Sequence, residues 1–151
     1  MSLTSALAGA EDGLLERLQA QSQVPGSPLA GVPIRLGDPG VGLMQEHVFI
    51  AESASADQRF VVTGTGANQK QEQFTLRVIV WVHREGDDYT ATRDRAKDLL
   101  WEIEKAVAAD PTLSGKVFDS WVSGLERRGG ITDTGRALET TVLVTAIAFL
   151  S

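Results

Sequence analysis

The ten residues from Phe74 to His83 restrict the possible folds of this chain more than any other segment. Every second side chain from Phe74 to Val82 is apolar, and a period of two is typical of a β-strand with one buried face. The intervening positions include Ile79 and Trp81, so the second face of the same strand is also partly apolar. The segment therefore predicts a strand inside a sheet whose two faces both carry apolar side chains.

Four further strands are expected from apolar alternation and from the turn residues around them. They are 32–36, 46–52, 116–127 and 137–150. Two polar, glycine-containing loops are expected, one between the strand 46–52 and the central strand and one between the last two strands. These loops are Ser53 to Gln73 and Arg128 to Arg136.

Two amphipathic helices are expected, at residues 1–20 and 90–109, with a proline- and glycine-containing connector at 21–31. Ser2 or Thr4 can cap the first helix, and Gly9 and Gly13 weaken it by about 1 kcal/mol each relative to alanine. The second helix carries an apolar stripe at helical spacing. Asp87 or Asp88 can cap it, and Pro111 ends it at or before Asp110.

This order of elements predicts one domain over residues 1–151, with residues 32–151 forming the sheet and the second helix. A closing hairpin and few crossover helices favour an antiparallel or mixed sheet rather than a parallel one. The expected class is α+β, with roughly five strands and two main helices packed on the sheet.

Composition excludes several classes of function. The net charge is −6 and no basic stripe is present, so tight binding of DNA or RNA is not expected. The chain has no cysteine, which excludes disulfides, a thiolate nucleophile and a cysteine zinc site. We expect a soluble protein without a secretion signal, because the longest apolar run, Val142 to Leu150, is too short to span a membrane as a helix.

Motifs for catalysis or cofactor binding are not found in the sequence. Gly64-Thr65-Gly66 begins like a dinucleotide-binding loop, but Gln69 replaces the third glycine and no helix follows directly. No P-loop and no Gly-x-Ser-x-Gly nucleophile turn occurs. We expect no enzyme activity and no cofactor. One alternative of a different class stays open, a small metal-binding module or metal-dependent enzyme that uses His47 and His83.

The last two predicted strands carry apolar residues on both faces. In 116–127 the period of two places Val117, Trp121 and Leu125 on one face, opposite Phe118 and Val122. The final strand has the same character, and two helices are too few to shield both faces of a five-stranded sheet. The sequence therefore predicts burial of sheet surface between subunits.

The chain from the central strand onward resembles the tail terminator, or tail-completion, proteins of long-tailed bacteriophages. The resemblance rests on an ordered series: the strand FTLRVIVWVHREG, the helix TRDRAKDLLWEIEKAVAADPTL, a Ser-Gly turn, the strand KVFDSWVSGLERR and the closing strand ALETTVLVTAIAFL. Element order agrees over most of the chain, and residues 74–127 carry the stronger local match. Neck and tail-tube subunits of such particles have similar patterns, so they remain an alternative.

The resemblance implies a structural ring, most often a hexamer, that sits on the last ring of the tail tube. Such a ring stops tube growth and offers a surface to the head-tail connector, or stopper, protein, while DNA passes through the lumen without specific binding. The implied location is the head-proximal end of the virion tail, after assembly in the host cytoplasm. The residues expected at interfaces with the partners are Phe60, Asn68, Lys70, Trp121, Arg127, Arg128, Thr132 and Arg136.

Overall fold

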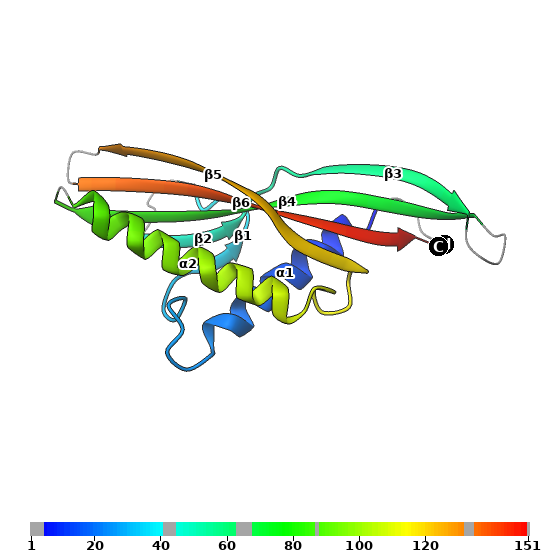
Figure 1. The fold of residues 1–151 in the computed structure, drawn as a ribbon, viewed down its shortest axis with the longest axis horizontal. Coiled ribbons are helices and arrows are strands. Elements are labelled where there is room, and N and C mark those ends of the chain that lie inside the picture. The colour runs from blue at the N-terminus through cyan, green and yellow to red at the C-terminus, as the bar shows by residue number, and fades with distance from the viewer. Residues whose placement is uncertain (1–4, 41–44, 63–67, 87, 132–134, 151) are drawn as a thin grey trace.

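Two helices and a six-stranded mixed sheet make up the fold of the computed structural model, which describes residues 5–40, 45–62, 68–86, 88–131 and 135–150 (Figure 1). The elements are α1 (Leu7–Ser22), β1 (Ile34–Leu36), β2 (Glu46–Ile50), β3 (Ser55–Val62), β4 (Asn68–Glu85), α2 (Tyr89–Ala109), β5 (Asp119–Ile131) and β6 (Gly135–Leu150). The expected α+β class is confirmed, with one strand more than predicted.

The sheet has the order β1-β2-β4-β6-β5, and β3 pairs with the first part of β4. Only the β1–β2 pair among the described strands is parallel; the other pairs are antiparallel. β4 is the central strand of the sheet. β3 and β2 pair with successive parts of one of its edges, and β6 pairs with its other edge along nearly its whole length. The hairpin of β3 and β4 projects beyond both helices (Figure 1).

The additional strand corrects the prediction of a long loop at Ser53 to Gln73. That segment contains β3 and the beginning of β4, which pair from Ser55 with Thr75 to Val62 with Asn68. Apolar alternation is absent from this segment because both of its faces carry polar side chains. Asp57 and Arg59 are exposed, and the buried side chain is Glu72, which accepts hydrogen bonds from Ala6 and Gln58. Cross-strand backbone pairing supplies the order that the side-chain pattern does not reveal.

The predicted loop at Arg128 to Arg136 is also largely strand. β5 continues to Ile131 and β6 begins at Gly135, so Ile131 pairs with Arg136 across the hairpin. Residues 132–134 lie outside the described part of the chain. The glycines in this segment suggest a loop, but Gly129 and Gly130 lie in the edge strand β5, and Gly135 begins β6 where it closely approaches the backbone of Arg84.

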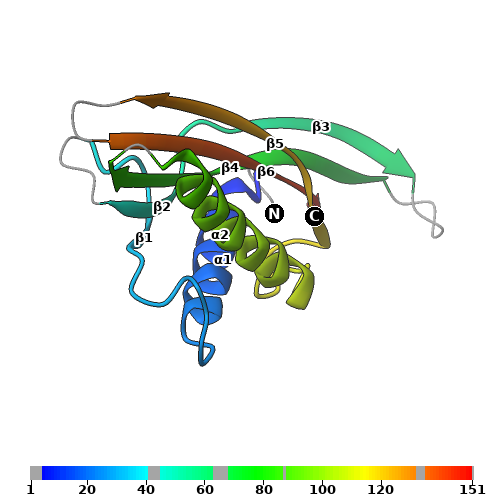
Figure 2. The same ribbon diagram turned by 60° about the vertical axis from the view of Figure 1, so that its left-hand side comes forward.

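Both helices lie on one side of the sheet and cover one of its faces (Figure 1, Figure 2). That face carries the alternate side chains predicted for the central strand, from Phe74 to Val82, and each of them is buried. α2 adds its apolar stripe, including the fully buried Leu99 and Ile103, and α1 adds Leu14 and Leu18. No helix in the described part of the chain is long and apolar enough to cross a membrane.

Local contacts explain where the two helices begin. α2 starts after Asp88, whose Oδ1 accepts a hydrogen bond of 3.0 Å from the amide of Ala91, and this confirms one of its two expected caps. α1 begins at Leu7, later than expected, and both Ser2 and Thr4 lie outside the described residues. A residue of the sheet fixes the start of α1, because Glu72 of β4 accepts a 2.7 Å hydrogen bond from the amide of Ala6.

Candidate assembly surface

The second face of the sheet carries no described helix (Figure 2). The strand register places its side chains in rows that run across the sheet, since residues that pair share a face and alternate with the residues of the covered face. From the tip of the β3–β4 hairpin inward, the rows are Arg59, Gln71 and Phe149; Asp57, Gln73, Ile147 and Asp119; Ser55, Thr75, Thr145 and Trp121; Arg77, Leu143 and Gly124; Arg35, Phe49, Ile79, Thr141 and Glu126; and His47, Trp81, Glu139 and Arg128.

A β-bulge changes the predicted faces of β5. The register shifts between Val122 and Gly124, so Leu125 pairs with Val142 and lies on the same face as Val122, not on the face of Trp121. Val117 precedes the strand and is buried. The expectation that Val117, Trp121 and Leu125 share one face is therefore wrong, because an inserted residue resets the period of two.

An exposed aromatic patch lies where β5 begins, on the face without helices. Its residues are Phe118, Trp121 and Phe149, which expose 68%, 40% and 39% of their surfaces. The rings of Phe118 and Phe149 contact edge to face with 5.2 Å between centroids, and the half-buried Ile147 lies in the row between Phe149 and Trp121. Exposed aromatic side chains gathered at one end of a sheet face are typical of sites of protein association.

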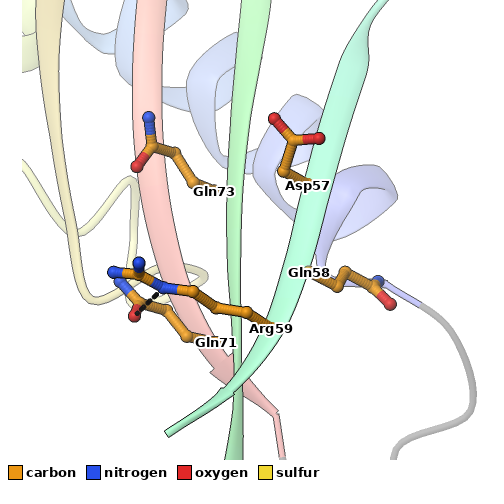
Figure 3. Close-up of a pocket in the computed structure, with 5 residues that line it drawn as sticks. All are labelled: Asp57, Gln58, Arg59, Gln71 and Gln73. Atoms are coloured by element: carbon orange, nitrogen blue, oxygen red, sulfur yellow. Dashed lines mark hydrogen bonds between the residues drawn. The ribbon is translucent and has the colours of Figure 1, made fainter.

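A polar groove lies beside this patch, on the hairpin of β3 and β4 (Figure 3). It has a volume of about 250 Å³ and is lined by Asp57, Arg59, Gln71 and Gln73, with Gln58 at its border. The Nε of Arg59 donates a 3.3 Å hydrogen bond to Oε1 of Gln71, which orients the guanidinium along the groove. The groove and the aromatic patch thus lie next to each other on one face at the same end of the sheet, the groove on β3 and β4 and the patch on β5 and β6.

The other end of this face is charged. Arg77, Glu126, Arg128 and Glu139 contribute to a second groove of about 300 Å³. None of these four side chains forms an ion pair within the described part of the chain. Two positive and two negative side chains without an ion-pair partner among the described residues are available to pair with a second protein.

The two histidines were the candidates for a metal site. His47 exposes only 5% of its surface, and neither ring nitrogen has a hydrogen-bond partner among the residues that the structure describes. Burial, and then the charge of Arg35, lowers the pKa of His47 below its ordinary value, which favours the neutral ring. His83 lies two residues along β4 from Trp81, the partner of His47. The described residues contain no group of three or more histidine, cysteine or acidic side chains that could hold a metal.

The structure divides the predicted interface residues between the two ends of the sheet. Phe60, Asn68 and Lys70 lie in the β3–β4 hairpin, where Lys70 pairs with Phe60 and Leu150. The other end holds three arginines, at 127 and 128 in β5 and at 136 in β6. Trp121 lies near the start of β5, toward the β3–β4 end, and Thr132 is outside the described residues.

Sequence reasoning missed most of the residues that form the aromatic patch and the polar groove. The predicted strand 116–127 includes Phe118, whereas this residue precedes β5 and is largely exposed. Asp57 and Arg59 fall in the segment predicted as a loop, and no motif in the sequence marks Asp119. The only signal that could have found them is the presence of two opposite charges spaced by two in 55–59, which share one face if that segment is a strand.

Comparison with known proteins gives a likeness of fold. No protein-family model matches the sequence, and no curated protein matches it. Among solved structures, a chain from a structure described as the virion of a native gene transfer agent (GTA) particle is similar, with a TM-score of 0.56 and 18% sequence identity. The match covers 97% of this chain and 100% of that chain. The two chains therefore share a fold over essentially their whole lengths.

Proposed function

We propose that this chain is a structural, non-enzymatic subunit of a phage-like particle. The observation that carries the proposal is the uncovered sheet face, which exposes Phe118, Trp121 and Phe149 beside grooves of polar and charged residues. A face of this kind suits burial against another protein rather than the binding of a small substrate. The fold likeness to a chain of a gene transfer agent virion agrees with this function.

Within such a particle, we assign the chain the position of tail terminator. The order of its strands and helices, which resembles that protein family, supports this assignment. The chain then forms a closed ring, a hexamer, on the last ring of the tail tube. The face of this hexamer that points away from the tube meets the connector or stopper protein, and DNA passes through the lumen of the hexamer. An acidic subunit of charge −6 suits a lumen that lets DNA slide, because like charges disfavour binding.

A closed ring follows from simple rules of symmetry. When one surface of a subunit contacts a different surface of an identical subunit, the assembly closes if the rotation between copies divides a full turn. The aromatic patch and the polar groove are different surfaces on one end of the sheet, so they provide the two halves of such a contact. This arrangement requires no second kind of subunit to form the ring.

Deletion of the gene for this chain from the genome that encodes the particle, followed by electron microscopy of the particles, tests the proposal. We expect tails of uncontrolled length that carry no head, and we expect a plasmid copy to restore normal tails. Tails of normal length joined to heads in the deletion strain would refute the terminator assignment. Gold labelling of the particle separates the alternatives, since a terminator is labelled only at the head-proximal end, whereas a tube subunit is labelled along the whole tail.

A further inference from the structure

β3 and β5 are the two outermost strands at the end of the sheet that contains the β3–β4 hairpin, and each has one free edge. β3 pairs only with β4, and β5 pairs only with β6, among the described strands. Neither Ser55–Arg59 nor Asp119–Val122 contains proline, and the bulge of β5 comes after Val122. Free strand edges that lack proline or bulges are templates for pairing with another chain. Both edges are therefore open to a further strand.

Strand direction makes these two edges compatible with each other. The local order is β3-β4-β6-β5, and each of the three pairs is antiparallel, so β3 and β5 run in opposite directions. If a second copy is placed beside the first by rotation, without inversion, its β5 meets the β3 of the first copy in antiparallel orientation. A contact of this kind uses a different surface on each partner, and it closes into a ring when the rotation between copies divides a full turn.

Charge selects the register of this contact. If the rows continued straight from one copy to the next, Asp57 of β3 would lie opposite Asp119 of β5, since both occupy one row. A shift by two residues preserves the faces and places Arg59 opposite Asp119 instead. Cross-strand pairs of opposite charge are favourable and pairs of like charge are not. A stagger between strands is also what a sheet needs in order to close into a barrel.

We infer that the β5 edge of one copy adds to the β3 edge of the next, with Asp119 paired to Arg59 and Trp121 covering the neighbouring polar groove. The inference deepens the proposed function and rests on it, because it identifies the contact that builds the ring. In this register Val122 lies opposite Ala56 on the covered face, and Trp121 lies opposite Asp57 on the open face.

The structure prepares Arg59 and Trp121 for these contacts. Arg59 uses its Nε for Gln71, which leaves both terminal nitrogens of the guanidinium for the carboxylate of Asp119. Trp121 is 40% exposed, so its ring has free surface to place against the groove and against the guanidinium. Aromatic and arginine side chains of this kind carry most of the binding free energy in protein interfaces.

Charge reversal tests the contact in assembled particles. A strain that lacks the gene receives plasmids for Arg59→Glu, Asp119→Arg or both changes. We expect each single variant to lower the number of normal-length tails by about tenfold or more, and the double variant to recover most of the loss, because a close charge pair contributes on the order of 1.5 kcal/mol or more. The matched control is Arg93→Glu, which alters an exposed arginine of α2 that forms an ion pair with the adjacent Asp94.

Cross-linking tests the register directly, and the chain contains no cysteine to interfere. The variant with Ala56→Cys and Val122→Cys should form disulfide-linked multimers on oxidation, in the particles or in purified oligomers. The variant with Ala56→Cys and Leu125→Cys places the second thiol farther along the same face of β5 and should not cross-link.

The outcomes separate the two proposals. Absence of the cross-link from both preparations, or single charge reversals that assemble like the parental chain, overturns the edge contact even if deletion gives uncontrolled tails. Normal tails after deletion combined with efficient cross-linking overturns the terminator assignment and leaves the edge contact in place. Thermal unfolding of each purified variant checks that a loss of assembly does not come from a loss of folding.

Discussion

Replacing Gly13 with alanine adds one methyl group at the point where α1 passes the turn that follows α2. A Cβ at this position would lie 2.1 Å from the carbonyl oxygen of Leu113, 3.0 Å from its carbonyl carbon and 2.9 Å from Cγ of Lys116. The carbonyl oxygen would have to move by roughly 1 Å to reach an ordinary contact distance. Lys116 can turn away, but the backbone of Leu113 cannot do so without disturbing its surroundings.

The turn around Leu113 is fixed by its own hydrogen bonds. Leu113 has a φ of 49° and a fully buried side chain, and its amide donates to the carbonyl oxygen of Asp110 at 3.0 Å. The carboxylate of Asp110 also accepts hydrogen bonds from the amides of Thr112 and Ser114, each at 3.1 Å. Because these contacts oppose movement of the turn, α1 must withdraw instead and lose part of its packing.

The expected magnitude follows from two opposing effects. Alanine is favoured over glycine inside a helix by about 1 kcal/mol, whereas forcing a methyl group into a packed core costs about 1–3 kcal/mol. An overlap with backbone puts Gly13→Ala at the upper end, so we expect a net destabilisation of about 2 kcal/mol. For a domain of this size the melting temperature should fall by about 4–8 °C.

Gly9→Ala is the matched control, one helical turn earlier on the same helix. Its added Cβ would meet only Cδ of Lys116, at 3.8 Å, which is an ordinary contact. We expect this variant to be more stable than the parental chain by about 0.5–1 kcal/mol. Urea unfolding followed by circular dichroism and tryptophan fluorescence measures both free energies. If Gly13→Ala is as stable as Gly9→Ala, the close approach of α1 to the turn is wrong.

Three further predictions concern hydrogen bonds of side chains. Glu72→Gln should lose one of the two hydrogen bonds to the buried carboxylate and destabilise the chain by about 1.5–3 kcal/mol, with faster hydrogen exchange in the first turn of α1. Unchanged exchange there would contradict the role of Glu72 in holding the start of α1. Hydrogen bonds from Arg95, at 2.6 and 2.9 Å, lower the pKa of Glu46 below its ordinary 4.5, so this pair stabilises the fold above pH 4.5 and the stabilisation is lost as the pH falls through the lowered pKa. Acid titration of unfolding should therefore show the stability difference between the parental chain and Glu46→Gln shrinking below pH 4.5, and a constant difference would exclude the pair as its cause. Asp88→Ala removes the acceptor for the Ala91 amide and should destabilise α2 by about 1 kcal/mol in urea unfolding, while Asp88→Asn should retain most of that stability.

The candidate surface was only partly predictable from the sequence. Trp121 was expected at an interface and lies exposed on the sheet face without helices. The other two aromatic residues of the patch, Phe118 and Phe149, are far from each other in the sequence, and only the pairing of β5 with β6 brings their rings to 5.2 Å between centroids. A pattern within one strand can indicate which face a side chain takes, but it cannot show which side chain of another strand lies beside it.

The sequence by itself determined the elements that depend on local periodicity. It was sufficient for α2, with its apolar stripe and Asp88 cap, and for the buried alternation from Phe74 to Val82. Both signals arise from burial of one face, which repeats along the chain at the period of the secondary structure. The α+β class followed from the order of these elements.

Tertiary structure alone decided the elements whose order comes from distant partners. β3 is a strand because β4 pairs with it, and α1 begins where the buried Glu72 accepts a hydrogen bond from Ala6, 66 residues away. The bulge that moves Leu125 to the face of Val122 depends on the register with β6. Backbone hydrogen bonds and buried polar contacts join residues without regard to composition, and so they leave no periodic trace in the sequence.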